Sequence, residues 1–322
     1  MNNKPHINEG LSKNLPQRPK EVKWIRLTAA FQLLLCLLGI LALSQAQAQI
    51  PIHLPNHFSA TDRINAFAEK GDTLFLAGAF ESLAPVHPFG AISNLAMDQI
   101  NYQAATPNNE VFDAIADGQG GFYVGGSFTQ VGGLVQNRVA HYDANGQLLP
   151  LSVSVDDGHV ESLALSGNIL FLGGSFTSVD GQARTGLAAY DLQSASLLPW
   201  NPVFTSVFLT PWVGKLLIHN QTLYVGGFFN QVNAQPRTLL AAFDLNTLNL
   251  NAFAPSISGF TVEDMLVHND HLYFCGDFTS VQATSRKSVA AINLYHNKLI
   301  NYAPIITGTV SSMVFKKAAI YL

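Results

Sequence analysis

The chain has 322 residues, of which 48% are hydrophobic and only 12% are charged. This composition excludes a disordered polyelectrolyte and leaves a globular or membrane-associated protein that is long enough to bury a sizeable core. The length is compatible with two average domains or with one long all-β unit.

A basic leader and an apolar run open the sequence. Residues 1–26 carry six basic and two acidic side chains, and the apolar run 27–43 follows directly. Ala46 and Ala48 are the small residues of a cleavage site, so we predict a signal peptide over residues 1–48 and a short segment over 49–62. An uncleaved anchor is the alternative, because the run is shorter than the ~20 residues that span a bilayer comfortably. Either form places the rest of the chain outside the cytoplasm, secreted or at the cell surface.

The remainder of the chain is acidic. Without the leader, 11 basic and 19 acidic residues remain, a net charge near −8 with no basic stripe. Nucleic acid is therefore not expected as a partner, and membrane contact is expected only through the leader. Cys275 is the one cysteine outside the apolar run, so packing rather than an internal disulfide has to stabilise the fold.

One short phrase recurs five times after residue 62, and its second glycines lie 48, 48, 53 and 49 residues apart. The copies share a glycine followed two residues later by a phenylalanine: Gly78 and Phe80, Gly126 and Phe128, Gly174 and Phe176, Gly227 and Phe229, Gly276 and Phe278. A fixed period in this range indicates a solenoid or a propeller. The glycines are expected where neighbouring backbone approaches a strand closely.

The third copy predicts four strands, over residues 160–165, 169–176, 187–191 and 197–200, with a polar loop between the second and third. The second stretch is almost continuously apolar, which is typical of a strand buried on both faces. Pro199 marks the last stretch as an edge strand, because proline cannot donate to a ladder. The counterparts of this last strand in the next two copies are residues 248–253 and 298–302.

Four antiparallel strands at this period, without a helical pattern, favour propeller blades over helical solenoids. We therefore predict an all-β fold, a β-propeller of four-stranded blades of about 48 residues. It covers residues 63–322, as five full units and part of a sixth. Residues 320–322 match the start of a second strand, so the propeller is expected to be incomplete at its C-terminus.

The phrase Leu223-Tyr-Val-Gly-Gly-Phe-Phe229, the loop with Arg237 and the stretch Leu240-Ala-Ala-Phe-Asp244 resemble the delta-60 type repeats of bacterial β-propellers. The resemblance covers residues 63–322 and rests on fivefold recurrence. Kelch repeats share the double glycine, but this chain lacks their regularly placed Tyr and Trp, so that likeness concerns architecture only. The resemblance implies a bacterial surface or secreted protein whose activity is poorly defined.

Four units place an arginine between their second and third strands: Arg138, Arg184, Arg237 and Arg286. These loops share one face of a propeller, so the arginines could form a ring that attracts carboxylates, sulfates or acidic glycans. In the alternative interpretation, each arginine pairs with an acid or a carbonyl of an adjacent blade and only stabilises the repeat.

Two tryptophans flank the longest segment between units, residues 201–211. Trp200 and Trp212 could stack on sugar faces, or they could simply cover a blade edge. Together with the four arginines they form the candidate ligand face.

Ligand-type residues elsewhere have simpler interpretations. One acid or amide ends each third strand, where such residues cap turns: Asp143, Asp191, Asp244 and Asn293. His268 and His271 lie in a predicted turn without the further ligands of a zinc site, and Asp156 and Asp157 lack the remaining acids of a calcium loop. No metal site or cofactor is predicted.

No nucleophile elbow, phosphate loop, dinucleotide fingerprint or zinc-protease helix occurs. We therefore expect a binding or scaffold module, used for adhesion or for recognition of an extracellular protein or glycan, rather than an enzyme. The alternative is a secreted propeller enzyme acting on glycans. It would need two acids within ~10 Å of each other at the mouth of the propeller, one of them with a raised pKa.

Overall fold

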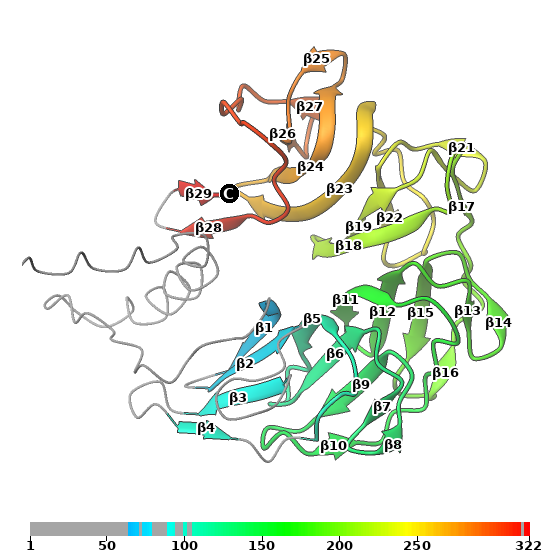
Figure 1. Ribbon diagram of the computed structural model, residues 1–322. Coiled ribbons are helices and arrows are strands. Elements are labelled where there is room, and N and C mark those ends of the chain that lie inside the picture. Colours follow the sequence, from blue (N-terminus) through cyan, green and yellow to red (C-terminus); the bar gives the residue numbers. More distant parts are fainter. Residues whose placement is uncertain (1–63, 71–72, 79–88, 94–98, 102–104, 317–318) are drawn as a thin grey trace, which may run out of the picture. The chain divides into compact units, whose positions relative to one another are not determined.

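The computed structural model describes residues 64–70, 73–78, 89–93, 99–101, 105–316 and 319–322. The predicted signal peptide, the segment 49–62 and Phe80 lie outside these residues. Every regular element of the described part is a β-strand. Figure 1 shows the strands as a series of small antiparallel sheets. None of the described residues forms a helix with the length and apolar character needed to cross a membrane.

Each repeat forms a sheet in which successive long strands are neighbours. Unit 1 contains β1 (Ile64–Lys70), β2 (Thr73–Gly78), β3 (Phe89–Ser93) and β4 (Gln99–Asn101), and unit 2 contains β5 (Val111–Ala116), β6 (Phe122–Gly126), β9 (Val139–Tyr142) and β10 (Leu148–Leu149). Unit 3 contains β11 (Val160–Ser166), β12 (Ile169–Gly174), β15 (Leu187–Asp191) and β16 (Ser196–Leu197), and unit 4 contains β18 (Trp212–His219), β19 (Thr222–Phe228) and β22 (Leu240–Asp244). Unit 5 contains β23 (Ile257–His268), β24 (His271–Val281), β26 (Val289–Asn293) and β27 (Lys298–Leu299), and β28 (Val314–Lys316) pairs with β29 (Ala319–Tyr321). The predicted β-propeller blades are confirmed, with these four strands in units 1, 2, 3 and 5 and three strands in unit 4.

The stretch predicted as a polar loop is a small hairpin. The hairpins are β7 (Gln130–Val131) with β8 (Leu134–Val135), β13 (Ser178–Val179) with β14 (Gln182–Ala183), and β20 (Gln231–Val232) with β21 (Gln235–Pro236); β17 (Phe204–Thr205) joins the last, and β25 (Thr284–Ser285) pairs with β24. In unit 3 the turn residues Asp180 and Gly181 both have positive φ, 48° and 69°. An Asp-Gly pair is favoured at such two-residue turns, because Asp and Gly tolerate this backbone conformation.

The fourth strands are shorter than predicted. In unit 3 the strand covers two residues, and in unit 4 it is reduced to a single bridge between Phe243 and Leu250. Beyond these points the carbonyl groups of Leu198, Asn251 and Ile300 accept hydrogen bonds from arginine side chains. Where the sequence pattern predicts a longer fourth strand, arginine side chains therefore bind carbonyl groups that a neighbouring strand would otherwise pair with.

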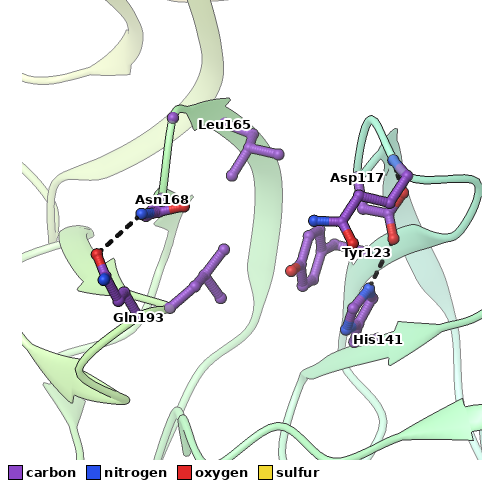
Figure 2. A pocket seen from close by; sticks show the side chains of 9 residues that line it. Asp117, Tyr123, His141, Leu165, Asn168 and Gln193 are labelled. Carbon is purple, nitrogen blue, oxygen red and sulfur yellow. Dashed lines mark hydrogen bonds and ion pairs between the residues drawn. The ribbon is translucent and has the colours of Figure 1, made fainter.

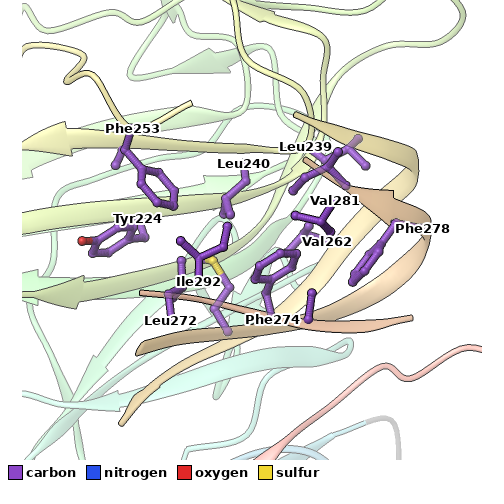
Figure 3. Packing of buried hydrophobic residues seen from close by; sticks show 14 residues of the cluster. Tyr224, Leu239, Leu240, Phe253, Val262, Leu272, Phe274, Phe278, Val281 and Ile292 are labelled. Atoms are coloured by element: carbon purple, nitrogen blue, oxygen red, sulfur yellow. The ribbon is translucent and has the colours of Figure 1, made fainter. Parts of the chain in front are cut away.

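The hydrophobic core lies between consecutive sheets. Figure 3 shows the cluster shared by units 4 and 5, where Tyr224 and Leu240 meet Val262, Phe274 and Ile292. Corresponding clusters join unit 2 to unit 3 and unit 3 to unit 4. Phe176, Phe229 and Phe278 belong to these clusters, Phe128 belongs to a cluster within unit 2, and all four are at most 1% exposed. Each unit is therefore stabilised mainly by its neighbours.

The recurring second glycine of the motif has a steric cause in units 2 to 5. The first strand carries a β-bulge opposite the glycine pair, as at Gly214 between Val213 and Lys215. A Cβ added to the second glycine would lie 2.0–2.3 Å from the carbonyl oxygen two residues before the bulge, in the pairs Gly126 with Glu110, Gly174 with His159, Gly227 with Trp212 and Gly276 with Thr261. The bulge leaves no room for a side chain at this position.

Candidate functional site

Comparison of equivalent positions in the five units shows which side chains the fold requires. The third-strand position paired with an aromatic residue of the second strand is alanine in four units: Ala91, Ala189, Ala242 and Ala291. In unit 2 this position is His141, paired with Tyr123. The fold tolerates alanine here, so blade packing does not explain the histidine.

Unit 2 departs from the repeat a second time in the turn between its first two strands. Ala116 pairs with Phe122, so five residues separate the strands, whereas two separate them in unit 3. Asp117 begins this longer turn. Its Oδ1 atom accepts hydrogen bonds from the backbone N–H groups of three turn residues, Gln119 (2.7 Å), Gly120 (2.8 Å) and Gly121 (2.9 Å). The turn therefore fixes the carboxylate in place.

The two features that distinguish unit 2 from the other units, Asp117 and His141, contact each other. The Oδ2 atom of Asp117 lies 3.0 Å from Nε2 of His141, and the imidazole stacks on the Tyr123 ring with centroids 4.1 Å apart. Burial raises the pKa of Asp117, but the hydrogen bonds from His141 and from the turn outweigh burial and lower it overall. Asp117 is therefore ionised at neutral pH and can only accept, so Nε2 of His141 donates. Burial and the Asp117 carboxylate raise the pKa of the Tyr123 hydroxyl.

A pocket of about 420 Å³ opens beside this pair, between units 2 and 3. Figure 2 shows its two walls. Unit 2 supplies Asp117, Gln119, Tyr123 and His141, and unit 3 supplies Leu165, Gly167, Asn168, Leu192 and Gln193. The Nδ2 atom of Asn168 donates to Oε1 of Gln193 at 3.2 Å. The volume is within the range of about 300–1,000 Å³ typical of small-molecule sites.

The ionised form of Asp117 contributes to stability. Its pKa in the folded protein is below the ordinary value of 3.8, so this contribution is fully present above pH 3.8 and is lost as the pH falls through the folded pKa. We expect wild type to lose more of its thermal stability than Asp117→Asn between pH 5 and low pH. Melting curves of both proteins across this range test the expectation, and parallel loss in the two would contradict it.

The structure places Arg184, Arg237 and Arg286 at equivalent points of three units. In each, Nη1 donates to the preceding carbonyl and Nη2 to a carbonyl 14 residues downstream, at 2.8 Å for Arg184, 2.7 Å for Arg237 and 3.4 Å for Arg286. The first two are buried, 5% and 9% exposed, and burial lowers their pKa. A ligand could contact these two guanidinium groups only if the side chains left their present partners.

Arg138 occupies a different position. Its backbone N–H donates to Phe128, as that of Gly186 donates to Phe176, so Gln136 rather than Arg138 is the counterpart of Arg184. The Arg138 side chain reaches the next unit, where Nη1 donates to the carbonyl of Val155 and Nε to that of Gly158. The structure therefore does not bring the four arginines into one equivalent set.

We expect Arg237→Ala to destabilise the protein by about 2 kcal/mol, because two backbone carbonyls lose a charged donor in a buried place. Arg286→Ala is the matched control. Arg286 is more exposed and its downstream hydrogen bond is longer, so its replacement should lower the free energy of unfolding by less. Urea unfolding of the two variants gives the comparison, and an equal loss would contradict a role that depends on burial.

The two tryptophans lie in different environments. Trp200 contacts Phe171 and Phe243 edge-on, and its Nε1 atom donates to the carbonyl of Leu248 at 2.7 Å, so it joins unit 3 to unit 4. Trp212 stacks on Phe228, with centroids 4.8 Å apart, beside Phe260. The structure does not bring the two indole rings together at one site.

A polar row on the first strands was missed by the sequence analysis. Side chains on first strands accept hydrogen bonds from the backbone of the next unit: Asp113 from Leu163 (2.8 Å), Ser162 from Leu216 (3.1 Å) and Asp264 from Met313 (2.8 Å). In unit 4 the position holds Lys215, whose Nζ lies 3.0 Å from Oδ1 of Asp264. Burial lowers the pKa of Lys215, but the carboxylates of Asp264 and Asp113 outweigh burial and raise it.

The predicted turn residues do cap turns. The Oδ1 atoms of Asp143, Asp191, Asp244 and Asn293 each accept hydrogen bonds from backbone N–H groups two to four residues later. Asp156 and Asp157 accept bonds from the β13–β14 hairpin. His268 stacks on Phe315, and the described residues contain no group of three side chains that could hold a metal ion.

Comparison with known proteins agrees with the fold. A family model described as a domain of unknown function (DUF5122) β-propeller matches residues 122–148, a stretch that includes Tyr123 and His141. The computationally designed protein Ika8 is similar in structure, with a TM-score of 0.52 and 13% identity over 80% of this chain and 66% of Ika8. The extracellular domain of BT4673 from B. thetaiotaomicron has a TM-score of 0.45 and 15% identity over 77% of this chain and 28% of that chain.

The chain thus spans less than two thirds of the length of either structure. No curated protein sequence matches it. By fold, the described part is a β-propeller.

Proposed function

We propose that the chain is an extracytoplasmic β-propeller binding module of the delta-60 type, and that it recognises its ligand in the pocket between units 2 and 3. The observation that carries this proposal is the Asp117–His141 pair. The pair lies at the pocket wall and is built from two departures from an otherwise regular repeat. Features that a repeat does not need for folding are candidates for binding.

Two further properties support recognition. The wall residues extend from strands or short turns of neighbouring sheets, so their positions are fixed before a ligand arrives, and pre-organisation lowers the cost of binding. The lining is also rich in hydrogen-bonding groups, with three side-chain amides in addition to the Asp117–His141 pair. An extracellular glycan or a protein carrying a suitable group is the expected partner.

A ligand screen with a matched pair of variants tests the proposal. His141→Ala gives unit 2 the residue that the other units have at this position, so it should fold normally. The control is His159→Ala, which removes a half-exposed histidine that pairs with Glu161 outside the pocket. We expect at least one compound from a library of soluble glycans and small molecules to bind wild type and the control, and to bind His141→Ala at least tenfold more weakly. A ligand that binds all three equally would place recognition elsewhere.

The extracytoplasmic location rests on the leader. N-terminal sequencing of protein recovered outside the cytoplasm, after expression of the full chain in a bacterium, is expected to show a new terminus near residue 49. Retention of Met1 in a membrane fraction would favour the uncleaved anchor, and a cytoplasmic product would contradict export.

An enzyme acting on glycans is the second candidate, because one carboxyl group has the property that such an enzyme needs. Burial and the nearby Asp277 carboxylate raise the pKa of Glu263, as expected for a general acid. Release of reducing sugar from a glycan panel by wild type, abolished by Glu263→Gln, would support this function. Wild type that binds a glycan and leaves it intact would contradict it.

A further inference from the structure

We infer that the pocket between units 2 and 3 takes a neutral sugar residue, held through its hydroxyl groups. This inference rests on the proposed function and names the ligand class for the same site. It follows from the charge of the lining, from its donors and acceptors, and from the apolar part of its wall.

Charge argues for a neutral ligand. The described residues that line the pocket include no lysine or arginine, so an anionic group would find no counter-ion among them. The one ionised carboxylate, Asp117, already accepts three backbone N–H groups at Oδ1 and the imidazole at Oδ2. These partners compensate its charge, and its side chain is only 8% exposed, so it offers little attraction to a cation. A ligand without formal charge fits such a lining best.

The remaining hydrogen-bonding groups match hydroxyls. Nε2 of His141 donates to Asp117, so Nδ1 is the ring nitrogen left for a ligand, and it accepts a hydrogen bond when the ring carries one proton. On the opposite wall the Asn168–Gln193 hydrogen bond uses one donor and one acceptor, which leaves Oδ1 of Asn168 to accept and Nε2 of Gln193 to donate. The unit 3 wall therefore offers an acceptor and a donor, and it faces the imidazole of the unit 2 wall (Figure 2). A hydroxyl group can satisfy both, because it donates one bond and accepts others.

The apolar part of the lining is small. Leu165 and Leu192 are its two aliphatic residues, both half-buried and both from unit 3. A sugar ring presents a face of C–H groups and an edge of hydroxyls, so it can lie against the leucines while its hydroxyls reach the amides and the imidazole. An apolar ligand would leave most of these polar groups without a hydrogen-bond partner, and each unpaired group would make the free energy of binding less favourable. The volume of about 420 Å³ accommodates a unit of this size.

The experiment uses isothermal titration calorimetry on the full chain with methyl glycosides of glucose, galactose, mannose and N-acetylglucosamine. Glucuronate is the acidic probe and glucosamine the cationic one. We expect at least one neutral glycoside to bind wild type and His159→Ala, and to bind His141→Ala and Gln193→Ala at least tenfold more weakly. Both charged probes should bind more weakly than the neutral glycoside. Gln193 is exposed, so its replacement tests the pocket without disturbing the core.

Each other outcome overturns a distinct statement. Tighter binding of glucuronate or glucosamine, still dependent on His141, would overturn the neutral class and leave the binding site in place. Absence of binding by every saccharide, together with a His141-dependent compound from the wider screen, would overturn the sugar assignment but not the proposed function. Saccharide binding that survives both pocket variants would overturn the site itself.

Discussion

Replacing Asp264 with alanine is expected to destabilise the protein by about 4 kcal/mol. The Asp264 carboxylate accepts hydrogen bonds from the backbone N–H groups of Met265 (2.9 Å) and Met313 (2.8 Å) and pairs with Lys215 (3.0 Å). Asp264 is 8% exposed. Its loss leaves two backbone donors unsatisfied and a partly buried ammonium group without its partner.

A double-mutant cycle separates these contributions. Adding Lys215→Met to Asp264→Ala removes the unpaired ammonium and should recover about 1 kcal/mol, while the two backbone donors stay unsatisfied. Chemical denaturation of wild type, both single variants and the double variant gives the coupling energy. Strictly additive losses would mean that Lys215 and Asp264 do not interact in solution.

Replacing Gly227 with alanine is expected to destabilise the protein by about 3 kcal/mol. The new Cβ would lie 2.3 Å from the carbonyl oxygen of Trp212 and 3.0 Å from two further backbone atoms, so the first strand of unit 4 would have to shift. Gly214→Ala in the same bulge is the control, because its nearest contact is at 3.7 Å. It should be neutral, or stabilising by up to about 1 kcal/mol through the unfolded state.

Thermal and urea unfolding of the two glycine variants test whether Gly227 is needed to avoid the carbonyl group of Trp212. The bulge explanation predicts a large difference between them, although both residues lie in the same pair of strands. Equal losses would show that glycine is needed for chain flexibility in this region, and not to make room for one carbonyl group.

Much of the blade could be predicted from the sequence, because its pattern repeats. The predicted third strand of unit 3, residues 187–191, has the observed bounds of β15. The fourth strands were predicted too long, since an apolar run does not reveal that arginine side chains take its carbonyl groups. The hairpin at Asp180–Gly181 was also missed, although the Asp-Gly pair is a turn signal.

The candidate site could not be found by looking for recurrence, because it consists of what does not recur. His141 lies in a third strand, and only comparison with the alanines of the other units marks it as unusual. Asp117 could be identified only from the structure, since its Oδ2 atom accepts from His141, 24 residues later, while its Oδ1 atom accepts from its own turn. The first-strand row at Asp113, Ser162 and Asp264 was equally hidden, because each acceptor meets a backbone N–H group of another unit.

The first-strand row also bears on how such an array can evolve. At three of the four junctions that the structure describes in detail, after units 2, 3 and 5, an acceptor side chain meets a backbone N–H group. Every unit possesses such a group, so duplicated or deleted copies could still fit together. Lys215 is the exception, because it requires an acidic side chain in the unit that follows. The junction of units 4 and 5 therefore fixes the order of its two copies, and recombination between repeats should be tolerated least there.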